Sequence, residues 1–563
     1  MVGVLLLYNP SGLDPALRDD FVNRLKSQLT LMPHQSVERI STELMFCVCV
    51  HHGQLPSGGV AREGERILAV SGSCWIDPRA SQLSTPIQIL SAMGRSAGEG
   101  VHDFGGSFAI AHLDQNTPEL TVLSDRFGTI PIYYRWWGQT LIVSSELKLL
   151  IDSRRDTLEL EALAEMMAVG YLVRPHTLVA GIRRLPAHHS LVCNRQGLRI
   201  AALPTPGYPR NRPVDNEAIR ELDSLVQRYL GRFVGVAPKY SIALSGGLDS
   251  RLLAMAAKRA GLQQVAFCVG EPRCQELQMA TRVAEMLSIP IKIHEIEGHS
   301  LPDWFGKMVW FTEGRVLPNH MHYMSARLSG SLPSGPQLHG LVGEAIFGGA
   351  FDAPSLVDAS PVSIQAACNA FAKGLIYWHK DTIQTSFTPQ LAERVQAAMG
   401  LSIQDVMDRI GFTGRYENLL DFKWRFRVEG FTIPCLLSQV MPWTDVVSPF
   451  LDKDIFDFGA TLETEGLKDR IAQIRWAMNH MPDVTRLPRV KDGVIIPIRE
   501  DVPDAYERGI RSLKRCGRIK DMLCLLSRGR INLHYGLSFP IYGQWYRRWR
   551  RVRQYVDGIL LSD

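Results

Sequence analysis

Apolar residues in the first third of the chain form short runs that alternate with polar positions and stop at glycine, proline or aspartate. Such runs are typical of β-strands bounded by turns. They predict many short strands, for example at residues 45–50, 66–70, 107–113, 120–123, 132–135 and 140–143. Helical spacing of apolar residues predicts helices over 15–29 and 158–167. The pattern indicates an α+β domain built on antiparallel sheet, covering residues 1–205.

A proline-rich stretch at residues 203–210 reads as a linker to a second domain, residues 212–563. Beyond it strand-like and helix-like runs alternate, which favours a parallel, doubly wound α/β sheet. Helical patterns dominate from about residue 365 and predict a helical C-terminal part that caps the sheet. The predicted strands are 240–244, 264–269 and 291–296, and the predicted helices are 251–260 and 275–287.

Composition narrows the class of protein only a little. The net charge of +5 over 563 residues gives no reason to expect nucleic acid as a partner. The ten cysteines include no CxxC pair, so we expect free thiols in a cytoplasmic protein. No apolar run approaches the ~20 residues needed to cross a bilayer, so no membrane insertion is expected. Five arginines among aromatics at residues 545–553 predict a solvated surface helix or, alternatively, a docking surface for an acidic peptide, nucleic acid or membrane headgroups.

The segment with the clearest chemistry is SGGLDS, residues 245–250, between a predicted strand and a predicted helix. Glycines let the backbone approach an anion, and the N–H groups of a helix N-terminus attract it. The hydroxyls of Ser245 and Ser250 add donors. Asp249 would repel a phosphate unless it holds a cation, so the segment predicts a site for a nucleotide phosphate and Mg²⁺. It is neither a Walker A loop nor a GxGxxG fingerprint.

Residues 245–250 resemble the pyrophosphate loop of the N-type ATP pyrophosphatases, and within them the asparagine synthetase family, which includes β-lactam synthetases and lasso-peptide cyclases. The resemblance implies an α+β, Ntn-hydrolase-like (class II glutamine amidotransferase-like) first domain and an α/β ATP-pyrophosphatase second domain. Similar segments follow in the family's order at 104–109, 125–128, 131–134, 145–148, 270–287, 339–349, 448–452 and 489–493.

The resemblance also implies roles for single residues. Asp249 and Glu344 would bind Mg²⁺, and Lys491 would neutralise the charge that develops as an amine attacks and pyrophosphate leaves. His339 is explained equally well as a packed histidine, and Lys491 as a solvated lysine. The residues expected to contact ATP or pyrophosphate are Leu244, Ser245, Gly246, Gly247, Asp249, Ser250, Val269, His339 and Gly340.

The chain departs from this family at three positions, Val2, Glu344 and Leu341. Glu344 stands where the family usually has Asp as a Mg²⁺ ligand, and its longer side chain can bind the same cation. Glutamine-dependent members carry a nucleophilic Cys after the initiator Met, where this chain has Val2, so no glutaminase activity is expected unless the start is mis-assigned. Leu341 stands where asparagine synthetases carry Glu and β-lactam synthetases Tyr, and leucine cannot accept a proton. Glu429 is an alternative base, or else it forms a salt bridge with a nearby arginine.

These features predict an ATP- and Mg²⁺-dependent ligase that activates a carboxylate as acyl-AMP and joins it to an amine. Since glutamine is excluded, the amine would come from the substrate, a small molecule or a peptide. A ribosomal precursor peptide closed into a macrolactam, with its protease as a partner, is the favoured hypothesis. The rivals are an asparagine synthase-type enzyme using free ammonia, a β-lactam-synthetase-like cyclase, and a binding scaffold with weak catalysis.

Overall fold

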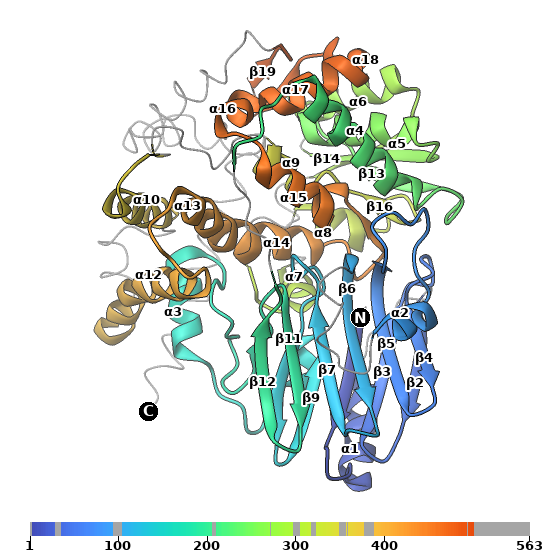
Figure 1. Ribbon diagram of the computed structural model, residues 1–563, viewed down its shortest axis with the longest axis vertical. Coiled ribbons are helices and arrows are strands. Elements are labelled where there is room, and N and C mark those ends of the chain that lie inside the picture. Colours follow the sequence, from blue (N-terminus) through green and yellow to red (C-terminus); the bar gives the residue numbers. More distant parts are fainter. Residues whose placement is uncertain are drawn as a thin grey trace.

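The computed structural model describes residues 3–28, 35–93, 104–204, 210–270, 272–296, 305–316, 322–347, 356, 358–375, 388–491 and 494–499. An antiparallel sandwich formed by the N-terminal part lies below a parallel sheet covered by helices (Figure 1). The arginine cluster at 545–553 lies outside the described residues. In the part of the chain described, no helix is long and apolar enough to cross a membrane.

The N-terminal sandwich consists of two six-stranded antiparallel sheets. The first has the order β10 (Arg183–Arg184), β8 (Tyr133–Trp137), β9 (Thr140–Ser144), β1 (Gly3–Tyr8), β3 (Met45–His51) and β2 (Ser36–Ser41). The second has the order β12 (Gly197–Ala202), β11 (His189–Asn194), β7 (Glu119–Ser124), β6 (Gly105–Asp114), β5 (Arg66–Trp75) and β4 (Gly59–Glu63).

Alternation along β1 explains the four layers of this domain. Val4 and Leu6 pack into the core between the sheets, whereas Leu5 and Leu7 face outward. The outward face is covered by α1 (Pro15–Gln28) and the 3₁₀ turn η2 (Leu147–Leu150), and the far face of the second sheet by α2 (Pro86–Ala92). Because both faces of β1 are buried, its sequence is continuously apolar instead of alternating.

The second domain contains a five-stranded parallel sheet with the order β15-β14-β13-β16-β17, so the strand order reverses between β13 and β16. One face packs on α4, α5, α6, α15 and α17, and the other on α8. The strands are β13 (Tyr240–Ala243), β14 (Gln264–Gly270), β15 (Ile291–Glu295), β16 (Gln337–Leu338) and β17 (Val446–Val447). These helices are α4 (Asn216–Gly231), α5 (Leu248–Arg259), α6 (Gln275–Leu287), α8 (His322–Leu328), α15 (Lys453–Thr461) and α17 (Ile471–His480).

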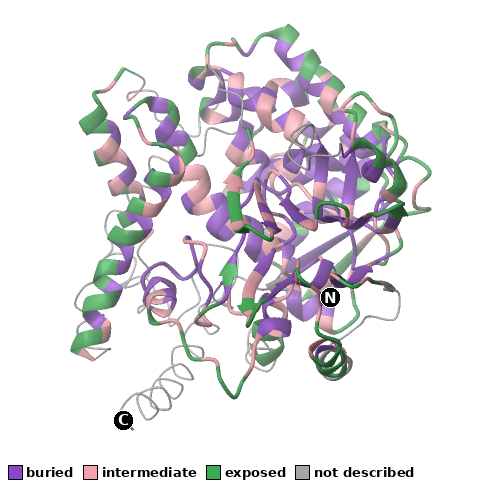
Figure 2. Cartoon of the chain, turned by 60° about the horizontal axis from the view of Figure 1, so that its bottom comes forward, coloured by how far each residue is buried: buried purple, intermediate pink, exposed green. Residues whose placement is uncertain are grey.

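A separate helical core lies beside the sheet and contacts the first domain through α12 and α3, with the outer face of α12 exposed (Figure 2). It contains α3 (Leu160–Val169), α7 (Phe305–Thr312), α10 (Pro361–Lys373), α12 (Pro389–Arg409), α13 (Tyr416–Lys423), the π-helix η6 (Trp424–Thr432) and α14 (Ile433–Leu437). The remaining elements are α9 (Gly343–Phe347), η7 (Pro449–Leu451), α16 (Thr464–Leu467), η8 (Lys468–Arg470), α18 (Pro482–Thr485), β18 (Arg489–Lys491) and β19 (Val494–Ile496).

The predicted strands and helices are confirmed with small shifts in their bounds, and so is the parallel doubly wound sheet. One correction concerns the helix expected at 251–260, since α5 already begins at Leu248. The sequence pattern missed β16 and β17, which are only two residues long and therefore show no periodicity.

Polar contacts join the two domains next to β17. The side-chain oxygen of Gln54 accepts the Thr444 hydroxyl at 3.0 Å and the Asp445 amide at 3.2 Å. The His52 ring lies 2.8 Å from the carbonyl of Met441. The Asp445 carboxylate is buried without an ion pair among the described residues, and burial raises its pKa to about 7.

Replacing Asp445 by Asn is expected to stabilise the protein at alkaline pH. The folded protein holds the proton of Asp445 more tightly than the unfolded chain does, because the pKa is raised on folding. The protonated carboxyl therefore contributes fully to the free energy of unfolding at about pH 4, and this contribution is lost as the pH rises through 7. Asp445→Asn should therefore raise the free energy of unfolding by roughly 2–4 kcal/mol at pH 8, with a gain that shrinks toward pH 4. Urea denaturation across this range measures it. The exposed Asp20→Asn serves as control, and an equal gain at every pH would contradict the assignment.

Candidate nucleotide and active site

Residues 245–250 leave the carboxyl end of β13 and enter α5. The strand order reverses between β13 and β16, and ligands of open α/β sheets bind at the carboxyl ends of the strands beside such a reversal. Gly247 is the last extended residue, so Asp249 and Ser250 lie in the first turn of α5. Among the described residues, the amides of Leu248 and Asp249 have no acceptor outside the helix. An anion could therefore accept hydrogen bonds from them.

The amides of Ser245, Gly246 and Gly247 have acceptors within the protein. The Ser245 amide donates to Ser250 Oγ at 3.0 Å, and the Gly247 amide to Ser245 Oγ at 3.1 Å. The Gly246 amide donates to Glu276 Oε1 at 3.1 Å. No sequence motif indicated the contact with Glu276, because the resemblance over residues 270–287 implies no role for this carboxylate. The predicted loop is thus ordered by its own hydroxyls and one carboxylate.

The second predicted loop follows β16 and packs on the start of α5. A Cβ atom at Gly340 would lie 3.1 Å from the backbone of Asp249, and one at Gly343 would lie 3.2 Å from Asp249 Cγ and 2.9 Å from the Phe450 ring. A side chain at either position would force the neighbouring atoms to move. Val342 has a φ of 60°, a left-handed conformation that is strained for a β-branched residue and typical of functional loops.

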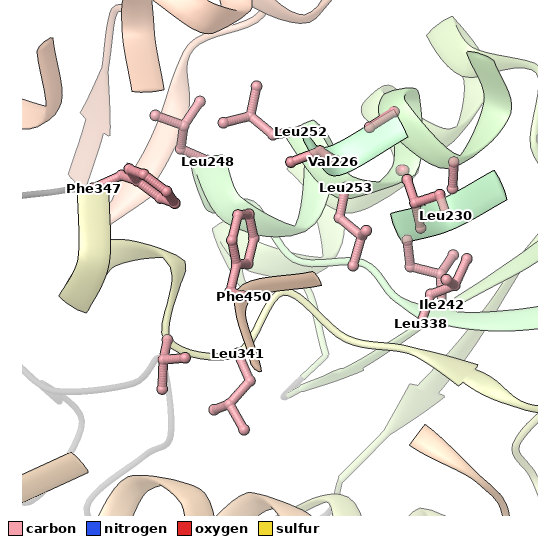
Figure 3. Close-up of a cluster of buried hydrophobic side chains, with 14 of the residues drawn as sticks. Val226, Leu230, Ile242, Leu248, Leu252, Leu253, Leu338, Leu341, Phe347 and Phe450 are labelled. Carbon is pink, nitrogen blue, oxygen red and sulfur yellow. The ribbon is translucent and has the colours of Figure 1, made fainter. Parts of the chain in front are cut away.

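A hydrophobic cluster lies beneath both loops. Leu248 of α5, Phe347 of α9 and Phe450 of η7 belong to one buried core, and the last two rings are 6.1 Å apart (Figure 3). Leu341 belongs to the same core and is 4% exposed. The Leu244 side chain is 1% exposed, so only its backbone lies at the loop. These apolar contacts fix the two loops relative to each other.

Arg470 lies between the two carboxylates that were predicted to bind Mg²⁺. Its Nη1 is 3.7 Å from Asp249 Oδ1, and its Nη2 forms a close ion pair with Glu344 Oε2. Gln473 donates to the same oxygen of Asp249 at 2.5 Å. Burial raises the pKa of Asp249, the charge of Arg470 opposes that rise, and the negative charge of Glu344 adds to it. The structure therefore brings Asp249 and Glu344 together, but with an arginine that no sequence motif indicated.

This donor set fits Mg²⁺ only in combination with a phosphate. Mg²⁺ is commonly held by one or two carboxylates, with substrate phosphates and water completing its shell. Asp249 and Glu344 would supply the protein oxygens. Within the described ranges, no group of three His, Cys, Asp or Glu side chains could hold a metal by itself.

The strand that carries Lys491 passes directly over the loop. The amide of Val490 donates to the Gly246 carbonyl at 2.7 Å. Arg251 ties the same segment down, since its guanidinium donates to the carbonyls of Leu487 at 2.7 Å and Pro488 at 3.0 Å. The backbone of Lys491 belongs to β18, while its side chain, Asp492 and Gly493 lie outside what the structure describes. The charge-neutralising role of Lys491 stays a prediction.

Val269 lies at the carboxyl end of β14 and His339 directly follows β16, the two strands that flank β13 in the parallel sheet. The His339 amide donates to the Val447 carbonyl at 3.0 Å, and its buried ring atom Nδ1 has no partner among the described residues. Burial, with a smaller contribution from the charge of Arg327, lowers the pKa of His339 to about 4, so the ring is neutral at pH 7. Val269 is 6% exposed in β14. Contact of these two side chains with a nucleotide stays a prediction.

Glu429, the candidate base, is buried in the π-helix η6 and held by arginines. Its two oxygens lie 3.1 Å from Arg425 Nη1 and 3.6 Å from Arg409 Nη1. Burial alone would raise the pKa of Glu429, but these arginines and Arg184 hold it below the usual range. A carboxylate with lowered proton affinity is a weak base at neutral pH. The geometry matches the alternative of a structural salt bridge.

Comparison with sequence families identifies both domains. Residues 84–203 match a glutamine amidotransferase domain, and residues 222–366 match asparagine synthase. A putative glutamine-hydrolysing asparagine synthetase 2 of Methanocaldococcus jannaschii is 24% identical over 170 residues, which are 29% of this chain and 33% of that protein. The chain thus spans about a third of the length of this curated relative. The fold is a class II glutamine amidotransferase-like domain followed by a parallel-sheet ATP-pyrophosphatase domain.

Solved structures with detectable likeness are distant. The glutamine phosphoribosylpyrophosphate amidotransferase of B. subtilis is 10% identical, with a TM-score of 0.25, and covers 60% of this chain and 81% of its own. An NH₃-dependent NAD synthetase of Campylobacter jejuni is 15% identical, with a TM-score of 0.17, and covers 34% of this chain and 94% of its own.

Removal of Arg470 is expected to destabilise the protein and to increase its response to magnesium. Arg470→Gln leaves Asp249 and Glu344 as neighbouring like charges and should lower the free energy of unfolding by ~1–2 kcal/mol, because both carboxylates keep some contact with solvent. Thermal denaturation with and without Mg²⁺ checks this. Millimolar Mg²⁺ should restore part of the loss, whereas Arg486→Gln, at an exposed ion pair, should change little. Equal behaviour of the two variants would refute the role of Arg470.

Glu429→Gln is expected to reduce stability and not turnover. Arg409 and Arg425 would lose their shared carboxylate, which should cost about 3 kcal/mol at pH 7. The lowered pKa of Glu429 places this stabilisation at neutral pH and its loss in the acid range, so the difference should narrow as the pH falls. Urea denaturation measures the effect on stability, and the steady-state rate of the enzyme measures the effect on turnover. The exposed Glu393→Gln serves as control in both measurements. A lost rate at unchanged stability would instead identify Glu429 as the base.

Proposed function

We propose that this protein is an ATP-dependent, AMP-forming ligase of the asparagine synthase type that joins a carboxylate to an amine. Its substrate is a peptide that supplies both groups, so the product is a macrolactam of the kind made by lasso-peptide cyclases. The proposal combines the two family matches with the arrangement of residues around the loop 245–250.

The observation that carries the proposal is the junction of two loops at the point where the strand order reverses. Free amides at the start of α5 lie there beside Asp249 and Glu344. Nucleotides bind at such points in open α/β sheets, and helix N-termini favour phosphates. A scaffold with no catalytic role would not need two carboxylates beside an anion-binding helix end.

In the first step a carboxylate oxygen of the substrate attacks the α-phosphorus of ATP. A new P–O bond forms while the bond from the α-phosphorus to the bridging oxygen breaks, and pyrophosphate leaves with that electron pair. The amides of Leu248 and Asp249 would donate to the departing phosphates. Mg²⁺ held by Asp249 and Glu344 would neutralise charge on the phosphate oxygens.

In the second step the amine nitrogen attacks the acyl carbon, the acyl–oxygen bond breaks, AMP leaves, and the amine proton passes to solvent. Lys491 would stabilise the negative charge of this step. Two features favour an amine within the substrate. Val2 replaces the cysteine that glutamine hydrolysis needs, and Leu341, buried in the core, cannot act as a base. Holding both reacting groups of one molecule together replaces a bimolecular step by a unimolecular one.

Substrate-dependent release of pyrophosphate and AMP tests this function. Peptides with a free N-terminal amine and an Asp or Glu side chain should support release together with loss of one water from the peptide mass. Asp249→Asn and Lys491→Met should each lower the rate by roughly 10²–10³-fold, as expected when a group acting on developing charge is removed. Asp20→Asn and the exposed Lys239→Met are matched controls.

The rival functions give different results in the same assay. Release with L-aspartate and ammonium chloride, but not with peptides, would support an ammonia-dependent asparagine synthase. Binding of peptides without any release of pyrophosphate would support a scaffold. Equal rates for Asp249→Asn and the wild type would rule out the site described above.

A further inference from the structure

The carboxylate of Glu276 reaches into the nucleotide loop from the first turn of α6. Its Oε1 accepts a hydrogen bond from the Gly246 amide at 3.1 Å. Among the described residues Glu276 forms no ion pair, because the guanidinium of Arg251 donates instead to backbone carbonyls, including Gly246 at 2.8 Å and Gly247 at 2.9 Å. The half-buried carboxylate of Glu276 therefore accepts a hydrogen bond from an amide of the loop that is expected to bind phosphate.

Gly246 is confined on both sides by this arrangement. A Cβ atom there would lie 2.9 Å from Val490 Cβ and 3.1 Å from Glu276 Oε2. The Gly246 carbonyl is fixed by the amide of Val490, and its N–H points to the carboxylate. A phosphate oxygen that bound this N–H would have to take the position of Glu276 Oε1. Two anions cannot share the donor, since they would repel each other at contact distance.

We propose that Glu276 is an exchangeable anion for this loop, occupying the Gly246 amide when no nucleotide is bound and ceding it to a phosphate oxygen of the pyrophosphate moiety. The inference rests on the proposed function. It makes Glu276 a specificity-determining residue. Pyrophosphate reaches the amides at the start of α5 as well as that of Gly246, and can offset the displacement of the carboxylate. Inorganic phosphate has too few contacts to do so.

Calorimetric titration of the full chain with magnesium pyrophosphate tests the exchange. Glu276→Gln keeps the shape and an acceptor oxygen but removes the charge. It should lower the Kd for pyrophosphate by about tenfold or more, because the like-charge repulsion is gone. It should also create measurable binding of inorganic phosphate. Glu285→Gln is the matched control, since it makes the same change of charge on the exposed side of α6.

The possible results distinguish the exchange at Glu276 from the ligase function on which it depends. Tighter binding by Glu276→Gln alone supports the exchange, since a purely structural carboxylate would not weaken ligand affinity. If the wild type binds pyrophosphate and Glu276→Gln binds it equally or less tightly, the exchange is wrong and the ligase proposal stands. If no form binds pyrophosphate, both fall. Should Glu276→Gln fold poorly in thermal denaturation, Glu276→Asp, whose shorter side chain withdraws from Gly246, must also tighten binding for the exchange to survive.

Discussion

Backbone segments approach one another at the carboxyl edge of the parallel sheet so closely that a side chain at their glycines would displace its neighbours. The loop after β16 touches the start of α5 through Gly340 and Gly343, and β18 crosses Gly246 from above. The neighbouring apolar side chains of Leu248, Phe347 and Phe450 hold these segments in register from below. The positions of the carboxylates and of the free amides all follow from this packing, since none of them lies on a segment that could adopt the arrangement alone.

Charge compensation is the second constraint on the site. Two carboxylates and a set of aligned amides at a partly buried site are each unfavourable without partners. The protein provides partners of its own, with Arg470 between Asp249 and Glu344, and Glu276 on the Gly246 amide. Arg470 would repel a magnesium ion bound to these carboxylates, and Glu276 would repel a phosphate bound to the Gly246 amide. A site that is neutralised internally keeps its geometry before a ligand arrives, and the ligand must compete with that neutralisation.

The first domain keeps the sandwich of a glutamine amidotransferase-like domain although position 2 is valine. Part of this domain contacts the second domain beside the parallel sheet. Gln54 bonds to Thr444 and Asp445 just before β17, and Lys148 pairs with Glu313 at 3.3 Å. These contacts are polar and partly buried, so they fix the relative position of the domains more than they add stability. The first domain therefore helps to hold the segment before β17 in place.

The sequence alone determined the two domains, the parallel doubly wound sheet and the loop 245–250, because strand and helix periodicity and a glycine-rich turn are local properties. It also placed Asp249 and Glu344 in one site, through a resemblance that spans both loops. Only the tertiary structure revealed Arg470 and Glu276, since each reaches the loop from a helix distant in sequence and neither stands in a motif that specifies its contact. The same holds for Glu429, whose ion pair with Arg409 depends on how two helices pack. Local pattern specifies which elements form, whereas the pairing of charges depends on where the packed elements bring side chains together.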